Sequence, residues 1–75
     1  MRRAVFDPED QRRRRRRARI TQGDIAKRLS ISSGALSQYE SGKDPLPWGL
    51  AAEDYELALA AALLDKHRAP AEGAA

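Results

Sequence analysis

Apolar residues in the middle of the chain recur at intervals typical of short helices. Ile25, Ala26 and Leu29 fall on one face of a helix with about 3.6 residues per turn. Thr21 precedes this stretch and Asp24 follows three residues later, a pattern in which the threonine hydroxyl caps the first turn. The spacing therefore predicts a helix over residues 22–29.

A second short helix is expected after the interruption formed by Ser30-Ile31-Ser32. Ser32 can cap a helix that begins at residue 33, and Leu36 then points toward the core. This helix should end at residue 40 or 41, because Gly42 is the residue type expected just after a helix. Residues 44–47 include two prolines and cannot continue it.

The last helix is expected over residues 48–67, with apolar residues on two adjacent stripes. A helix that is apolar over more than a narrow face is either central to a core or buried in part against another subunit. The basic residues near its end suit the negative end of the helix dipole. The first stripe comprises Leu50, Leu57, Ala61 and Leu64, and the second comprises Trp48, Ala52, Tyr55, Leu59 and Leu63.

The first helix, expected over residues 8–18, has almost no apolar face. Asp7 can cap its start, Pro8 suits the first helical position, and the acids that follow suit the positive end of the dipole. Only Ala18 and the aliphatic stems of the arginines are expected to pack. The pattern thus predicts a compact all-α fold of four or five helices. Its domain spans residues 8–68, with a flexible basic arm over 1–7 and a disordered tail over 69–75.

The composition limits what so short a chain can do. Hydrophobic residues make up 41% of the 75 residues, but 14 of them are alanine, so one small core is the most that we expect. An enzyme is not expected, since no nucleophile–base pair stands out. The lack of cysteine and the single histidine, His67, argue against a metal centre, and no cofactor is expected. Without a long apolar run or a signal-peptide pattern, we expect no membrane span and a cytoplasmic location.

The net charge of +3 conceals two parts of opposite sign. Residues 1–28 carry eleven basic and four acidic residues, a net of +7, whereas residues 29–75 carry three basic and seven acidic residues, a net of −4. The six consecutive arginines at residues 12–17 repel one another and serve no core. This asymmetry indicates an anionic partner, either nucleic acid or an anionic membrane. We favour this interpretation over the alternative, in which the basic segment only aids solubility.

Residues at fixed spacing within the stretch 21–43 form a recognisable motif. They are Thr21-Gln22, Ile25-Ala26, Leu29, Ile31-Ser32, Leu36-Ser37, Tyr39-Glu40 and Gly42-Lys43. The motif resembles the helix-turn-helix of the Cro and lambda-repressor family, also called the xenobiotic-response-element family. The likeness extends more loosely over residues 8–64. It implies a lambda-repressor-like domain that binds double-stranded DNA.

The outer face of the second hairpin helix carries Ser33, Gly34, Ser37 and Gln38. These short or polar side chains can enter a major groove without steric conflict. The resemblance implies that they occupy the base-reading positions. Gln38 can make a two-point contact to adenine, which is worth roughly 1–3 kcal/mol of discrimination.

The resemblance also implies residues that contact phosphate and one internal ion pair. Gln22 takes the place of a glutamine that holds a phosphate at a helix N-terminus. Arg15 and Glu40 match a structural salt bridge between the first and third helices. The consecutive arginines project from all sides of the first helix, so only some of them can reach DNA. The expected phosphate-binding set is Thr21, Gln22, Ser41, Lys43, Arg12, Arg13, Arg16, Arg17 and Arg19.

Three departures from the family pattern concern the fold. The family usually has glycine at the position of Ser30, where a left-handed turn costs a non-glycine residue roughly 1–2 kcal/mol. It also commonly has glycine at the position of Arg19. The first helix normally carries leucine or valine toward the core, where this chain has arginine.

Three classes of function follow from these features. The first is a sequence-specific DNA-binding regulator, a repressor in a bacterial cell or phage-infected host, that binds a palindromic site as a homodimer at the nucleoid. Its candidate dimer surface on the last helix comprises Trp48, Tyr55, Leu59 and Leu63. The second is an arginine-rich RNA-binding protein. The third is a helix-turn-helix-derived module that binds another protein, as an antitoxin does.

Overall fold

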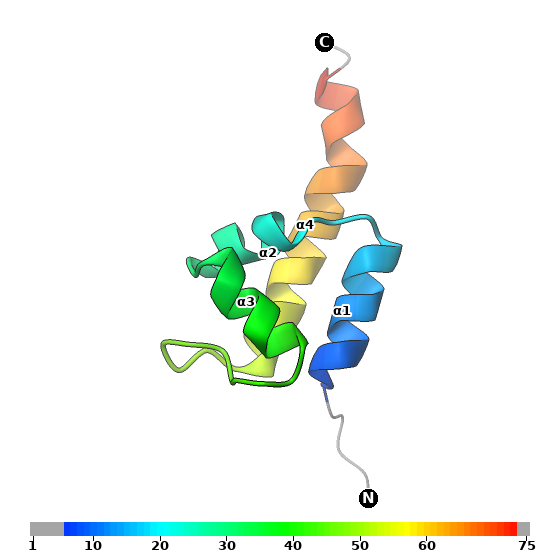
Figure 1. Ribbon diagram of the computed structural model, residues 1–75. Coiled ribbons are helices and arrows are strands. Elements are labelled where there is room, and N and C mark those ends of the chain that lie inside the picture. The colour runs from blue at the N-terminus through cyan, green and yellow to red at the C-terminus, as the bar shows by residue number, and fades with distance from the viewer. Residues whose placement is uncertain (1–5, 74–75) are drawn as a thin grey trace, which may run out of the picture.

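The computed structural model describes residues 6–73, which form four helices and no strand. The helices are α1 (Pro8–Arg17), α2 (Gln22–Leu29), α3 (Ser33–Glu40) and α4 (Ala52–Gly73). α2 packs against both α3 and α4, while α1 packs against α3 and α4 from the other side (Figure 1). The all-α fold expected from the sequence is therefore confirmed.

The α2–α3 hairpin has the boundaries that its local signals predict. The Thr21 hydroxyl accepts a hydrogen bond from the Asp24 backbone N–H at 3.0 Å, and Ser32 caps α3 in the same way, accepting from Ala35 at 3.0 Å. Ser30 ends α2 in the left-handed conformation, with φ of 60°, and Arg19 ends the turn after α1 with φ of 62°. At both positions the family that the sequence resembles commonly has glycine.

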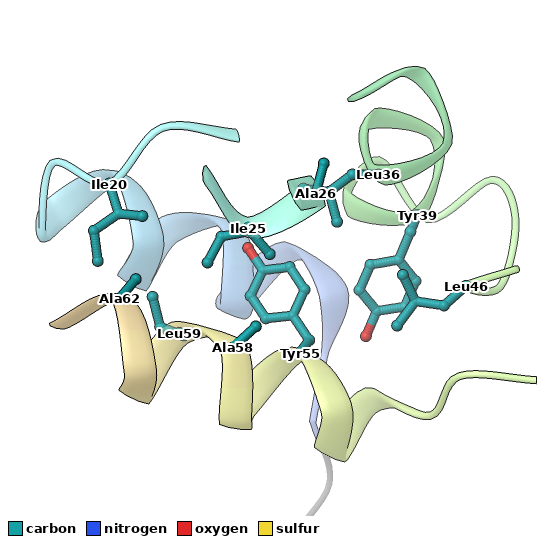
Figure 2. Close-up of a cluster of buried hydrophobic side chains, with 10 residues drawn as sticks. All are labelled: Ile20, Ile25, Ala26, Leu36, Tyr39, Leu46, Tyr55, Ala58, Leu59 and Ala62. Atoms are coloured by element: carbon teal, nitrogen blue, oxygen red, sulfur yellow. The ribbon is translucent and has the colours of Figure 1, made fainter. Parts of the chain in front are cut away.

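One small core holds α2, α3 and α4 together. Tyr39 of α3 and Tyr55 of α4 lie side by side, with ring centroids 5.8 Å apart, and Ile25 of α2 is fully buried beside them (Figure 2). Leu46 brings the loop after α3 onto this cluster. The buried apolar side chains are Ile20, Ile25, Ala26, Leu36, Tyr39, Leu46, Tyr55, Ala58, Leu59 and Ala62.

The predicted start of the last helix at Trp48 is wrong. Trp48 and Gly49 both have positive φ, 64° and 73°, which no α-helix tolerates, and Leu50 closes a turn onto the Pro47 carbonyl. The helix begins at Ala52 instead, where the Asp54 carboxylate accepts from the Ala51 backbone N–H at 2.7 Å. An acid three residues into a helix that bonds back to the residue before it is a start signal.

The two apolar stripes of α4 have different environments. Tyr55 and Leu59 of the second stripe are buried in the core of the chain itself, so the prediction that they form a dimer surface is corrected. Leu63 is half-buried against the same core, and Trp48 lies in the loop before α4 with 83% of its surface exposed. In the first stripe, Leu57 and Leu64 are exposed to solvent.

The first helix packs against the other helices through polar side chains. The sequence had predicted packing only by Ala18 and the aliphatic stems of the arginines. Gln11 is fully buried, Arg15 is 7% exposed, and Ala18 packs half-buried against the core. These three residues follow one another at steps of four and three, so they share one face of α1. Where related proteins use leucine or valine, this chain therefore buries hydrogen-bonding groups.

Glu40 is the acceptor at the centre of this buried polar contact. Its carboxylate receives hydrogen bonds from Arg15 Nε at 2.8 Å and Arg15 Nη2 at 3.0 Å, and another from Gln22 Nε2 at 3.0 Å. The Tyr55 hydroxyl donates a fourth. The remaining Arg15 amino group donates to the Ile20 carbonyl at 2.7 Å. The structural ion pair that the resemblance implied is thus present, and it joins all four helices.

A second polar contact fixes the other end of α1. The Gln11 amide donates to the Ala52 carbonyl at 3.1 Å and to Glu56 at 2.6 Å, while the Tyr39 hydroxyl donates to Gln11. Arg14 forms a two-point contact with Glu56 and also bonds Asp10. In the described part of the chain, no buried side-chain nitrogen or oxygen lacks a partner. The polar core is therefore fully satisfied, which is the condition for it to stabilise the fold.

The arm and the tail fall mostly outside this description. Residues 1–5 and 74–75 lie outside the described residues. α4 continues to Gly73, past the predicted helix end at His67. The division into an arm over 1–7 and a tail over 69–75 stays a prediction.

Replacing Ser30 with glycine should stabilise the protein. Glycine removes the side-chain clash at φ of 60°, worth roughly 1–2 kcal/mol, and part of this gain is offset by the greater freedom of the unfolded chain. We expect the free energy of unfolding in urea to rise by about 0.5–1 kcal/mol. The matched control is Lys27→Gly within α2, which should lower it by roughly 0.5–1 kcal/mol. If Ser30→Gly and Lys27→Gly lowered the free energy of unfolding equally, the backbone at Ser30 would not be strained.

Stability should fall as the pH is lowered below the ordinary range of a glutamate. Burial disfavours the charged Glu40 carboxylate, but the hydrogen bonds from Arg15, Tyr55 and Gln22 outweigh burial and hold the pKa of Glu40 below its ordinary value of 4.5. A lowered folded pKa gives stability that is present above pH 4.5 and lost as the pH falls through the folded value. Urea unfolding measured between about pH 6 and pH 3 checks this.

The variant Glu40→Gln separates this carboxylate from the others. It should lower the free energy of unfolding near pH 7 by about 3–5 kcal/mol, because Arg15 is left buried without its counter-charge. It should also flatten the loss of stability on acidification. The control Glu53→Gln removes an exposed carboxylate of α4 and should keep the wild-type pH dependence. A full wild-type slope in Glu40→Gln would be inconsistent with this role.

Candidate nucleic-acid interface

The outer face of α3 is exposed and makes no part of the core. Ser33, Gly34, Ser37 and Gln38 lie on it, while Leu36, Tyr39 and Glu40 on the opposite side are buried. A Cβ added at Gly34 would meet only the Ser32 hydroxyl, at 3.9 Å. Packing within the chain therefore does not require glycine there. The side chains of this face are short or polar, which suits the close approach of another molecule.

A hollow beside this face gathers residues from three helices. α1 contributes arginines, α2 contributes its first residue, and α3 contributes the edge of its exposed face. Arg16 is exposed and Arg12 is half-buried at its rim. The lining residues are Arg12, Arg15, Arg16, Gln22, Ser37, Glu40 and Ser41. Since Glu40 is already paired with Arg15, the two rim arginines give the hollow a positive character that suits an anion.

Gln22 is held in place at the start of α2. Its amide nitrogen donates to Glu40, which orients the side chain at the hollow. The Thr21 hydroxyl accepts from the Asp24 backbone N–H, and its own proton can still be donated outward. A helix start also concentrates backbone N–H groups and the positive end of the helix dipole. The start of α2 thus offers several hydrogen-bond donors beside α3.

Two expected phosphate-binding residues follow α3 and differ in what they can offer. The Ser41 hydroxyl donates to the Gln38 carbonyl at 3.0 Å, so its proton is already in use. Lys43 is exposed, and its backbone N–H bonds the same carbonyl at 3.0 Å, which fixes the chain just after the helix. Lys43 is therefore the better donor of the two.

Three of the expected arginines lie away from the hollow. Arg13 pairs with Asp10 at 3.0 Å, and Arg13 and Arg17 lie one turn apart on the side of α1 away from Gln11. Arg19 lines a different depression, shared with Ile20, Asp24, Ala62, Asp65 and Lys66. The structure therefore brings Arg12 and Arg16 to the α3 face and does not bring Arg13, Arg17 or Arg19 there.

The sequence pattern did not reveal how α1 is held against α3 and α4. Gln11, Tyr39 and Glu56 connect α1 to α3 and α4. The two-point hydrogen bond from Arg14 lowers the pKa of Glu56 and keeps its carboxylate charged. The spacing of Gln11, Arg15 and Ala18 along one helix face was the available signal.

The described residues contain neither a membrane span nor a candidate metal cluster. No helix within residues 6–73 combines the length and the apolar character needed to cross a membrane. The same residues contain no cluster of three or more histidine, aspartate or glutamate side chains that could hold a metal ion. The exposed polar face and the basic hollow both suit an anionic ligand.

A comparison with protein families agrees with this geometry. A family model described as a helix-turn-helix domain matches residues 12–74, from the middle of α1 to the end of α4. No curated protein and no solved structure matches the chain. The match covers most of the chain and contains the α2–α3 hairpin with its exposed outer face. The chain belongs to the helix-turn-helix domain family.

Proposed function

We propose that the protein is a sequence-specific regulator that binds double-stranded DNA and acts as a repressor. One observation carries this proposal: the polar outer face of α3 lies directly beside a basic hollow lined by Arg12, Arg16 and Gln22. A helix that enters the major groove needs such an exposed face. Positive side chains beside that helix can contact the phosphates that flank the groove. The expected location is the cytoplasm of a bacterial or phage-infected cell, at the nucleoid.

Base recognition is assigned to the exposed residues of α3. Gln38 carries an amide that can both donate and accept, and so it can contact two atoms of one adenine. The Ser33 and Ser37 hydroxyls can donate or accept, which makes them tolerant of several bases. Gly34 has open space around it and lets the helix backbone approach the groove closely.

Phosphate contacts are assigned to the residues that surround this face. Arg12 and Arg16 lie on one side, with Thr21 and Gln22 at the start of α2, and Lys43 lies after α3. Such contacts fix the register of the protein on the duplex without reading sequence. Arg13, Arg17 and Arg19 add to the positive potential that attracts DNA at a distance.

The proposed repressor works as a homodimer on a palindromic site. One hairpin contacts only a few base pairs, so two hairpins about 34 Å apart along the duplex would give a site of useful length. Bound protein would then exclude other proteins from that DNA. An arginine-rich RNA-binding function and a protein-binding, antitoxin-like function are the alternatives that the binding experiment separates.

Selection of bound sites from a pool of random duplexes tests the proposal. We expect a palindromic consensus, bound at least about 1000-fold more tightly than random duplex and more tightly than single-stranded RNA. Equal affinity for the selected site and for random duplex would contradict sequence-specific regulation. Preferential binding of RNA would favour the alternative.

Gln38→Ala and Arg16→Ala should weaken DNA binding in different ways. Gln38→Ala should lose roughly 1–3 kcal/mol of discrimination, mainly at one base pair of each half-site. Arg16→Ala should weaken binding to all duplexes and reduce the slope of log affinity against log salt by about 0.9 for each phosphate that is no longer neutralised. Fluorescence anisotropy over a salt series measures both effects.

Arg17→Ala is the matched control, because Arg17 is exposed on the same helix but does not line the hollow. It should change the salt slope less than Arg16→Ala does. Equal effects of the two arginines would contradict the assignment of the hollow as the phosphate site.

A further inference from the structure

The outer side of α4 carries an apolar surface that this chain does not cover. Leu57 is 68% exposed and Leu64 is 71% exposed, with the half-buried Ala61 between them. Nothing in the core uses these two leucines, because Tyr55, Leu59 and Ala62 occupy the opposite side of the helix. The far end of α4 extends beyond α1, α2 and α3 (Figure 1). Exposed leucines that line up along one side of a projecting helix are typical of an interface.

The spacing along this side is that of helices that pair with each other. Leu57, Ala61 and Leu64 follow at steps of four and three, and the same alternation continues to Asp54 and Arg68. An average step of 3.5 residues keeps one side of a helix facing a partner helix. The pattern, which we call the α4 seam, comprises Asp54, Leu57, Ala61, Leu64 and Arg68.

The seam is shaped and charged for a copy of itself in the opposite orientation. It is acidic at its beginning, at Asp54, and basic at its end, at Arg68. Its midpoint is Ala61, a small residue that allows two helix backbones to approach closely. Pairing in the same orientation would place Asp54 against Asp54 and Arg68 against Arg68, which is repulsive. Pairing in opposite orientations places unlike charges together at both ends.

Shallow hollows along the seam provide room for the partner's leucines. One lies between α4 and the end of α2 and includes Leu29, Leu50 and Leu57. A second includes Leu64 and Arg68, and the two meet at Ala61. A leucine that enters either hollow is removed from water, which is favourable by roughly 25 cal/mol for each Å² of apolar surface.

We propose that two copies of the chain pair through the α4 seam, antiparallel, about a two-fold axis at Ala61. Leu57 then packs against Leu64 of the partner subunit, and Leu64 packs against Leu57 of the partner subunit. Asp54 faces Arg68 of the partner subunit, in addition to its bond with the Ala51 backbone, and Arg68 also keeps its contact with Asp65 of its own helix at 3.3 Å. The proposal rests on the homodimer of the proposed function and names its interface.

Sedimentation equilibrium of the full chain without DNA tests the pairing. The wild-type protein should form dimers at micromolar to millimolar concentration. Leu57→Glu and Leu64→Lys should each weaken the dimer by about 100-fold, since each removes two leucines from the interface. Both residues are exposed, so circular dichroism should show an unchanged helical fold.

The double variant determines the orientation. Leu57→Glu and Leu64→Lys combined place opposite charges against each other across an antiparallel pair, and the dimer should recover to within about tenfold of the wild type. The two positions are about 10 Å apart along one helix, so the introduced charges do not pair within one chain. In a parallel pair like charges would meet and the affinity would not recover. Lys66→Glu, on the opposite side of α4, should leave the dimer unchanged.

Several outcomes would overturn the proposal. These are a wild-type chain that stays monomeric at millimolar concentration, a dimer insensitive to both leucine variants, and a double variant that does not recover. A monomer that still selects a duplex sequence would refute the α4 seam and the homodimer, and it would leave base recognition by α3 standing. A seam-dependent dimer with no sequence preference would refute the DNA-binding proposal alone.

Discussion

The buried ion pair between Arg15 and Glu40 is the contact on which the arrangement of this domain depends. Two charged groups inside so small a protein are costly unless every hydrogen-bonding atom is satisfied. Here the carboxylate accepts from Arg15, Gln22 and Tyr55, and Arg15 also donates to the Ile20 carbonyl. Each donor comes from a different part of the chain. The carboxylate is therefore fully bonded only when α1, α2, α3 and α4 are all in place, which favours one arrangement of the helices over other compact ones.

The same contact links folding to the α3 face proposed to meet DNA. Glu40 is the last residue of α3, and the groups that it holds include Gln22 at the start of α2 and Arg15 at the base of the basic hollow. The position of α3 relative to the hollow is thus set by buried hydrogen bonds rather than by loops. Pre-organisation of this kind lowers the entropy that binding must remove. It also explains why α1 can do without leucines: Gln11 and Arg15 hold it through bonds in place of apolar packing.

Local signals in the sequence were sufficient for the hairpin but not for α1 or α4. Thr21, Ser32 and Gly42 act on their immediate neighbours, so the bounds of α2 and α3 follow from them. The start of α4 depends on the positive φ of Trp48, which hydrophobic spacing does not reveal. Both stripes of α4 were visible, but which of them faces the core depends on where α2 and α3 pack. The burial of Gln11 could not be predicted from hydrophobic spacing, because glutamine is polar. Only the helix face that Gln11 shares with Arg15 indicates that its side chain is buried. The DNA-facing assignments of single residues rest on the family resemblance and the exposure of the α3 face.

The two sides of α3 have a consequence for how such a protein can change over generations. Its inward residues, Leu36, Tyr39 and Glu40, are tied to the rest of the fold, while Ser33, Gly34, Ser37 and Gln38 lie on the outer side. Substitutions at those four positions leave the core and the buried ion pair untouched. A lineage carrying this scaffold can therefore change the surface that α3 presents by a few substitutions without first gaining extra stability to tolerate them. The outer face of α3 can thus diversify independently of the buried contacts that hold the four helices together.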